Sequence, residues 1–157
     1  MREGYGFRLG DRLGQKLVTD TTRIMLIDDN RDVGLSFKIV LEHYYESRLK
    51  VDTFTNPTSA LDNFGAGLYD LVIIDTVMPE MNGFEVYRKL KEIDKKVKVY
   101  FLVSGKLYED ATRRLFPELN ESNFIQIPIA NEAFVRKVGE ALHPVYHSVN
   151  RVRLYDS

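Results

Sequence analysis

Three aspartates follow two short apolar segments of the chain, and their spacing suggests a site that could do chemistry. Residues 24–27 run directly into Asp28 and Asp29, and residues 71–74 end at Asp75. Short apolar segments of this kind are typical of strands buried on both faces of a parallel sheet. Because ligands gather outside the carboxyl ends of such strands, we expect the carboxylates to meet at one edge. A pocket of that composition suits a hard divalent cation such as Mg²⁺.

The elements that must position these aspartates alternate between strand and helix patterns. Apolar segments predict strands at 23–27, 50–55, 70–74, 97–103 and 124–127. Helical spacing predicts helices after the capping residues Asn30, Asn56 and Asn82, and at 107–116 and 131–142. In the third of these helices we expect Val86, Leu90 and Ile93 to be buried. Such alternation with short loops indicates an α/β fold, a single doubly wound five-stranded parallel sheet with helices on both faces. We expect an N-terminal extension over 1–22, one domain over 23–143 and a C-terminal tail over 144–157.

Composition excludes several classes of function. The chain has 157 residues, a formal net charge of -1 and scattered basic residues, which gives no electrostatic footprint for nucleic acid. It has no Cys, so neither disulfides nor thiolate chemistry are available. Apolar segments are too short to span a bilayer and the start lacks a signal-peptide pattern, so we expect a cytoplasmic protein without membrane contact.

The order of these parts resembles the receiver domain of response regulators in two-component signalling, which has a flavodoxin-like fold. The resemblance covers residues 22–143 and rests on Asp28-Asp29, Asp75, Met78-Pro79, Gly83 and Ser104-Gly105, which follow in order and roughly in spacing. It implies the strand order 2-1-3-4-5. It also implies a protein that accepts a phosphoryl group on its own side chain and is not a turnover enzyme.

The resemblance assigns a role to each site residue. Asp75 would be the phosphoacceptor, a carboxylate nucleophile that forms an acyl phosphate. Asp29 and Asp75 would bind Mg²⁺ directly, Asp28 would bind it through water, and the Val77 carbonyl would complete the protein ligands. Two further residues would act on the phosphoryl group and its signal, Ser104 by a hydrogen bond and Phe124 at the aromatic switch position. The phosphodonor would be a histidine kinase or a phosphotransfer protein.

The chain departs from the receiver pattern at the end of the fifth strand. Receivers usually carry Lys before the Pro, whereas this chain has Ile127-Pro128. The missing ammonium removes a charge-assisted contact worth roughly 1.5–3 kcal/mol. Its absence should also raise the pKa values of the clustered carboxylates. Lys106 offers a substitute charge, although an exposed residue at the start of a helix is the more ordinary interpretation. By the resemblance, we expect the Ile127-Pro128 bond to be cis.

Three functions compete at this point. The first is a single-domain receiver phosphorylated on Asp75. The second, favoured by Ile127, is a pseudo-receiver that acts as a phosphorylation-independent interaction module. The third is an aspartyl-phosphate phosphatase of the haloacid-dehalogenase type, which we rank last because Val77 stands where that class carries a second acid.

A signal from a receiver must leave through a surface. In receivers that surface is the face of helix four, strand five and helix five. Here we expect it to bind a downstream protein or a second copy of the chain. It would include Tyr108, Phe116, Phe124 and the outward side of 131–142, with Arg136 and Lys137 exposed.

Overall fold

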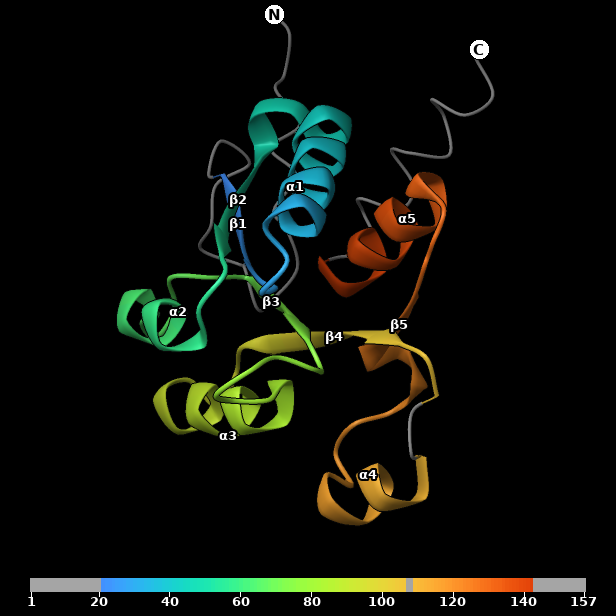
Figure 1. Cartoon of the computed structure of the whole chain (residues 1–157). Helices are drawn as coiled ribbons and strands as arrows, with labels where there is room; N and C mark the ends of the chain where they lie inside the picture. The colour runs from blue at the N-terminus through green and yellow to red at the C-terminus, as the bar shows by residue number, and fades with distance from the viewer. Residues whose placement is uncertain (1–20, 107–108, 143–157) are drawn as a thin grey trace, which may run out of the picture.

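The computed structural model of the chain describes residues 21–106 and 109–142 (Figure 1). Most of the expected N-terminal extension, the whole expected tail over 144–157, and the single residues Tyr108 and His143 lie outside the described residues. Within the described ranges, no helix is both long and apolar enough to cross a bilayer.

Five parallel strands form the sheet in the order β2-β1-β3-β4-β5, which confirms the predicted topology. The strands are β1 (Thr22–Ile27), β2 (Leu49–Phe54), β3 (Leu71–Asp75), β4 (Lys98–Ser104) and β5 (Phe124–Ile127). The α-helices are α1 (Arg31–Tyr45), α2 (Pro57–Asn63), α3 (Gly83–Ile93), α4 (Glu109–Leu115) and α5 (Asn131–Leu142). Short 3-10 helices η1 (Glu46–Arg48) and η2 (Glu121–Asn123) precede β2 and β5.

Apolar side chains cover both faces of the sheet. Successive residues of a strand point to opposite faces, so Ile24 and Leu26 of β1 join one core cluster and Met25 and Ile27 join the other. All four side chains are completely buried. Helices α1 and α5 cover the first face, and α2, α3 and α4 cover the second (Figure 1). Burial on both faces explains why residues 24–27 of β1 and 71–74 of β3 are all apolar.

Polar caps start three of the helices where the sequence predicted them. The side chain of Asn30 accepts hydrogen bonds at the start of α1, and Asn56 accepts one from the Ser59 N–H before α2. At α3, Asn82 and Glu85 form a reciprocal capping box. The expected burial of Ile93 is wrong, since this side chain is 46% exposed. Ile93 ends the helix, so the buried stripe stops one turn earlier, at Leu90.

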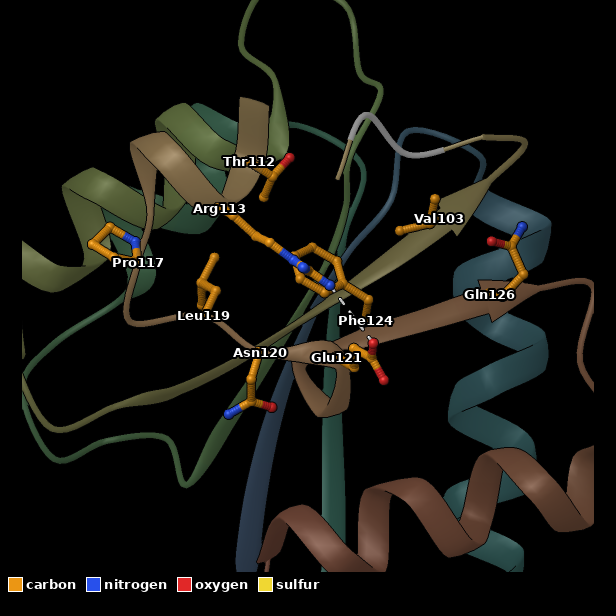
Figure 2. Close-up of a pocket in the computed structure, with 9 residues that line it drawn as sticks. All are labelled: Val103, Thr112, Arg113, Pro117, Leu119, Asn120, Glu121, Phe124 and Gln126. Atoms are coloured by element: carbon orange, nitrogen blue, oxygen red, sulfur yellow. Dashed lines mark ion pairs between the residues drawn. The ribbon is translucent and has the colours of Figure 1, made fainter. Parts of the chain in front are cut away.

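Helix α4, which like α2 has seven residues, leaves space beneath it on the second face. A pocket of about 500 Å³ lies between α4 and the strands β4 and β5 (Figure 2). Its lining combines apolar and polar side chains: Val103, Thr112, Arg113, Pro117, Leu119, Asn120, Glu121, Phe124 and Gln126. Arg113 reaches from α4 across the pocket to Glu121, with 3.7 Å between the guanidinium nitrogen and the carboxylate oxygen.

Helices α1 and α5 pack closely at a single glycine. The Tyr45 hydroxyl is buried and donates to the Val135 carbonyl at 3.1 Å. A methyl group at Gly139 would lie 2.7 Å from that hydroxyl oxygen. No ordinary Cβ contact is so short, so the two helices fit together only because position 139 lacks a side chain.

This contact predicts a coupled pair of substitutions. Gly139→Ala should destabilise the domain by roughly 1–3 kcal/mol from overpacking, reduced by about 1 kcal/mol of helix propensity. Tyr45→Phe alone should cost about 0.5–1.5 kcal/mol for the lost hydrogen bond. Tyr45→Phe also removes the oxygen that would clash with a methyl group at position 139. In urea unfolding, the double variant should therefore lose less free energy of unfolding than the two single variants lose in sum. Simple additivity would show that the two positions do not meet in this way.

Candidate functional site

Asp28 is held at the end of β1 by backbone hydrogen bonds. Its N–H donates to the Phe54 carbonyl of β2 at 3.0 Å, which continues the β1–β2 pairing by one residue. Its carboxylate accepts from the Asn30 N–H at 2.8 Å, and the side chain is 4% exposed. Asn30 in turn caps α1, so the turn that orients Asp28 also starts the helix. The carboxylate therefore has a fixed direction before any ligand arrives.

Asp75 is the last residue of β3 and is oriented by the loop that follows it. The Val77 N–H donates to the Asp75 carboxylate at 3.2 Å. Thr76 is buried, and both its N–H and its hydroxyl donate to the Leu102 carbonyl of β4, at 3.1 and 3.0 Å. The β3–α3 loop is therefore tied to the neighbouring strand directly beside the candidate acceptor.

Gly83 closes this loop against the backbone of Asp75. Its N–H donates to the Thr76 carbonyl at 3.2 Å, and a Cβ at this position would lie 2.5 Å from the Asp75 carbonyl oxygen. Only glycine fits at so short a distance. Within the loop Glu80 has a φ of 69°, a left-handed conformation that is uncommon for a residue with a side chain. Glu80 therefore adopts a backbone conformation that it would not prefer by itself, because the contacts that close the β3–α3 loop hold it there.

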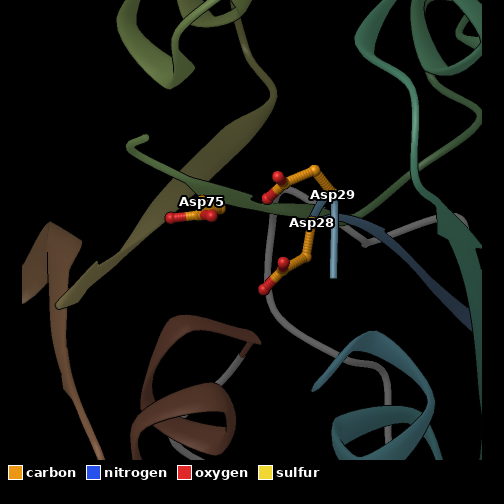
Figure 3. Close-up of side chains that lie close together, drawn as sticks. All are labelled: Asp28, Asp29 and Asp75. Atoms are coloured by element: carbon orange, nitrogen blue, oxygen red, sulfur yellow. The ribbon is translucent and has the colours of Figure 1, made fainter. Parts of the chain in front are cut away.

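The structure brings Asp28, Asp29 and Asp75 together as the sequence predicted (Figure 3). Each offers one carboxylate oxygen, and these oxygens all lie within 4.8 Å of one another. Asp28 is buried, Asp75 is half-buried and Asp29 is exposed. Among the described residues, no Lys or Arg forms an ion pair with any of them. The cluster therefore concentrates negative charge without a protein cation to offset it.

Burial and mutual repulsion raise the pKa values in this cluster. Burial raises the pKa of Asp75 to about 6, with a smaller rise from the charges of Asp28 and Asp29. The hydrogen bond from the Val77 N–H opposes this shift of the Asp75 pKa. The pKa of Asp28 is also raised, first by burial and then by the charge of Asp29, against the Asn30 N–H. The direction matches the sequence expectation, but burial is the largest cause.

The donor set fits a hard divalent cation. Carboxylate oxygens are the ligands that Mg²⁺ prefers in proteins, and it keeps several waters when it binds one or two of them. Asp28, Asp29 and Asp75 supply such oxygens from the ends of two adjacent strands. The Val77 peptide lies beside them, since its N–H bonds to Asp75. The acidic cluster is thus consistent with a Mg²⁺ site.

Ser104 and Ile127 end the neighbouring strands β4 and β5. They are partners in the β4–β5 register and line one groove of about 470 Å³ beside α1. Ser104 is exposed, whereas Ile127 is half-buried and packs against the core of the α1–α5 face. The bond between Ile127 and Pro128 is cis, as expected. Lys106 is exposed and is not among the groups that shift the pKa of Asp75, so in this conformation it does not replace the missing ammonium.

The expected output face needs two corrections. Phe116 is buried, with 6% exposure, because its ring packs between Phe84 and Tyr87. The exposed apolar residue of α4 is instead Leu115, at 63%. Lys137 is half-buried and donates to the Phe124 carbonyl at 3.2 Å, so it is not a free surface charge. Of the two charges expected outside α5, Arg136 is the exposed one.

Sequence reasoning missed two residues near Asp75, Thr76 and Phe84. Thr76 ties the β3–α3 loop to β4, and Phe84 packs against Phe116 after α4. The spacing of Gly83 from Asp75 was a signal in the sequence, but the reason for the glycine, its close approach to the Asp75 carbonyl, appears only in the structure. The role of Phe84 left no signal, because ring contacts between distant segments leave no periodic pattern in a sequence.

Comparison with known proteins agrees with this geometry. The model of the response regulator receiver domain family matches residues 24–138. The "Uncharacterized transcriptional regulatory protein YkoG" of Bacillus subtilis is 26% identical over 119 residues, which cover 76% of this chain and 50% of that protein. "Response regulator ArlR" of Staphylococcus aureus is 30% identical over 71 residues, 45% of this chain and 31% of that protein. The chain therefore spans half or less of the length of these relatives.

Solved structures show the same fold. The non-phosphorylated HemR receiver domain of Leptospira biflexa superposes with a TM-score of 0.66 at 22% identity, covering 78% of this chain and 94% of that one. A CheY-like receiver domain protein of Methanospirillum hungatei gives a TM-score of 0.67 at 20% identity, with the same coverage of 78% and 94%. Together with the family match over most of the chain, these likenesses lead to one conclusion: this chain belongs to the response regulator receiver domain family of two-component signalling.

Proposed function

We propose that this domain accepts a phosphoryl group on Asp75 and binds Mg²⁺ with Asp28, Asp29 and Asp75. One observation carries the proposal, the meeting of these carboxylate oxygens within 4.8 Å at the carboxyl edge of the sheet. Negative charges at so short a distance repel one another, and this repulsion destabilises the fold unless a ligand offsets it. A site built by two strand ends and two oriented turns therefore favours a cation-dependent function.

The chemistry is nucleophilic substitution at phosphorus. A carboxylate oxygen of Asp75 attacks the phosphorus of the donor, the bond to the donor's leaving group breaks, and an acyl phosphate forms. With a pKa of about 6, Asp75 is mostly ionised at neutral pH and can act as the nucleophile. When bound, Mg²⁺ supplies positive charge that offsets the charges of the carboxylates and the phosphodonor. Ser104, exposed beside the site, donates a hydrogen bond to a phosphoryl oxygen.

The partners follow from the family. Receiver domains generally take phosphoryl groups from a histidine kinase, and we propose such a kinase or a phosphotransfer protein as the donor. Phe124 holds the aromatic switch position, and the signal leaves through the face of α4, β5 and α5 to a downstream protein or a second copy of the chain. Receivers usually act in the cytoplasm, and we propose the same location. The segments 1–22 and 144–157 flank the receiver-like domain in this proposal.

A pseudo-receiver that binds partners without phosphorylation is the second candidate. One observation favours it, the apolar setting of Ile127. This side chain packs with the core of the α1–α5 face and lines a groove with Val33 and Phe37. An ammonium is absent there, so a bound phosphoryl group would lack one charge-assisted contact. The tests below separate the two functions.

The first test is modification of Asp75. With Mg²⁺ and acetyl phosphate, the protein should gain the mass of one phosphoryl group, and the adduct should be labile to hydroxylamine, as acyl phosphates are. Asp75→Asn should abolish the adduct, while Asp62→Asn, which changes an exposed carboxylate on α2, should leave it unchanged. Absence of the adduct in the wild-type protein, together with no Mg²⁺-dependent rise in melting temperature, would favour the pseudo-receiver.

The second test is the pH dependence of stability without metal. Folding raises the pKa of Asp75 from 3.8 to about 6, so the folded state binds this proton more tightly. The resulting stabilisation is complete below pH 3.8 and is lost as pH rises through about 6. The wild-type protein should therefore lose stability relative to Asp75→Asn as pH rises from about 1.5 units below the folded-state pKa to about 1.5 units above it, measured by urea unfolding in EDTA. If the free energies of unfolding of the two proteins change with pH in parallel, the pKa of Asp75 is not raised in the metal-free protein.

The third test restores the missing charge. Ile127→Lys places an ammonium next to Ser104 and should tighten fluoroberyllate binding in the presence of Mg²⁺ by about 10-fold or more, the equivalent of roughly 1.5–3 kcal/mol. Ile127→Met, which keeps the position apolar, is the matched control and should leave the affinity unchanged. Loss of stability without any gain in affinity would mean that Ile127 serves only as core.

A further inference from the structure

Helix α4 lies over a pocket and is followed at once by a packed aromatic residue, Phe116. The pocket of about 500 Å³ separates the body of the helix from β4 and β5, with Thr112 and Arg113 on one wall and Val103 and Phe124 on the other (Figure 2). Phe116 follows the helix, and its N–H donates to the Thr112 carbonyl at 2.8 Å. The ion pair between Arg113 and Glu121 crosses this pocket, but both side chains are largely exposed, so it holds α4 only weakly. The pocket therefore leaves room for α4 to change its angle while the end at Phe116 stays anchored.

The anchor of α4 is a set of contacts with α3. The ring of Phe116 stacks on that of Phe84 with 5.2 Å between centroids and an interplanar angle of 21°. Tyr87 meets the same ring edge-on at 5.7 Å, and the Arg88 guanidinium lies over it at 4.9 Å. The Tyr87 hydroxyl also donates to Glu118 at 2.8 Å, just beyond the helix. The position of α4 is therefore set by the first two turns of α3.

Phe84 is the member of this set that also reaches the sheet. Its ring centroid lies 4.9 Å from that of Phe101 in β4 and 6.5 Å from that of Phe124 in β5. Phe101 and Phe124 stack on each other at 5.5 Å. Each aromatic pair contributes about 0.5–1.5 kcal/mol beyond burial, so a displacement of one ring is opposed by all of its neighbours.

The backbone joins Phe84 to the candidate acceptor. Phe84 shares a peptide bond with Gly83, whose N–H bonds to the Thr76 carbonyl and whose Cα leaves no room for a methyl group against the Asp75 carbonyl. A change in the backbone of Asp75 or Thr76 must therefore move Gly83 or break its hydrogen bond. Asn82 and Glu85, on either side of Gly83 and Phe84, form the capping box at the N-terminus of α3, so the first turn of the helix moves as one piece.

We propose that Phe84 is a positioning residue that couples the Asp75 loop to α4 through the ring of Phe116. Modification of Asp75 shifts the first turn of α3, Phe84 carries the shift to Phe116, and α4 turns over the pocket beneath it. This route runs through α3 and does not need Ser104, although Phe124 borders it, with its ring centroid 6.5 Å from that of Phe84. The proposal rests on the proposed function, since it takes Asp75 as the modified residue.

The absence of Cys in the chain allows a direct measurement of α4. Arg114→Cys places one thiol on an exposed position of α4 for an environment-sensitive fluorophore. Fluoroberyllate with Mg²⁺ serves as the phosphoryl mimic, and its bound form is followed separately by ¹⁹F NMR. The label is then read in the otherwise unchanged chain, in Phe84→Leu and in Phe116→Leu, which cuts the same link from the side of α4. Phe64→Leu is the matched control, because Phe64 is buried on the same face but stacks on Tyr69 at 6.1 Å.

The two readouts separate the possible results. We expect bound fluoroberyllate in all four proteins, and a fluorescence response that Phe64→Leu keeps and that Phe84→Leu and Phe116→Leu reduce by at least half. If either of these two variants binds the mimic and keeps the full response, the proposed coupling is overturned. If the protein with Phe84 intact shows no bound fluoroberyllate signal, the proposed function fails, and this inference fails with it. Because Phe84→Leu and Phe116→Leu are both tested, the coupling can still be refuted if one of the two variants does not fold.

Discussion

Repulsion among Asp28, Asp29 and Asp75 is the constraint on which the rest of the site depends. The parallel sheet brings the ends of β1 and β3 side by side, so their carboxylates lie close together despite the electrostatic repulsion between them. Two backbone N–H groups, those of Asn30 and Val77, offset part of that cost and fix the direction of each acid. A bound cation would offset the remainder, and the geometry of the fold is consistent with such a site.

Ile127 changes the balance of charge at this edge. In most receivers a lysine at this position would offset part of the carboxylate charge, but here the side chain contributes to the core of the α1–α5 face. The pKa values of Asp28 and Asp75 are raised, chiefly by burial, and in the proposed function a bound cation offsets the charge that a lysine would otherwise offset. The same substitution makes the groove beside Ser104 more apolar, a surface that suits contact with another protein as well as phosphoryl transfer.

The sequence was sufficient wherever the information was local. Strands buried on both faces, Asn caps and the carboxylates at strand ends follow from patterns of a few residues, and all of these were predicted correctly. The errors concern contacts between distant segments. Phe116 was expected at the surface and lies in an aromatic cluster with Phe84, and Lys137 was expected to be free and bonds to β5. Ile93 fitted the helical period but fell in the last turn, where the packed face ends.

The contacts of Gly83, Phe84 and Phe116 join the β3–α3 loop to α4, and the proposed coupling between Asp75 and α4 rests on them. The proposed function and the proposed coupling both require that the carboxylates of Asp28, Asp29 and Asp75 bind a cation and that Asp75 accepts a phosphoryl group. A crystal structure with Mg²⁺ and fluoroberyllate tests that claim most directly. The account predicts a beryllium–oxygen bond to Asp75 and a Mg²⁺ ion held by the carboxylates of Asp29 and Asp75 and by the Val77 carbonyl. Crystals grown under the same conditions with water alone between the three aspartates would contradict it.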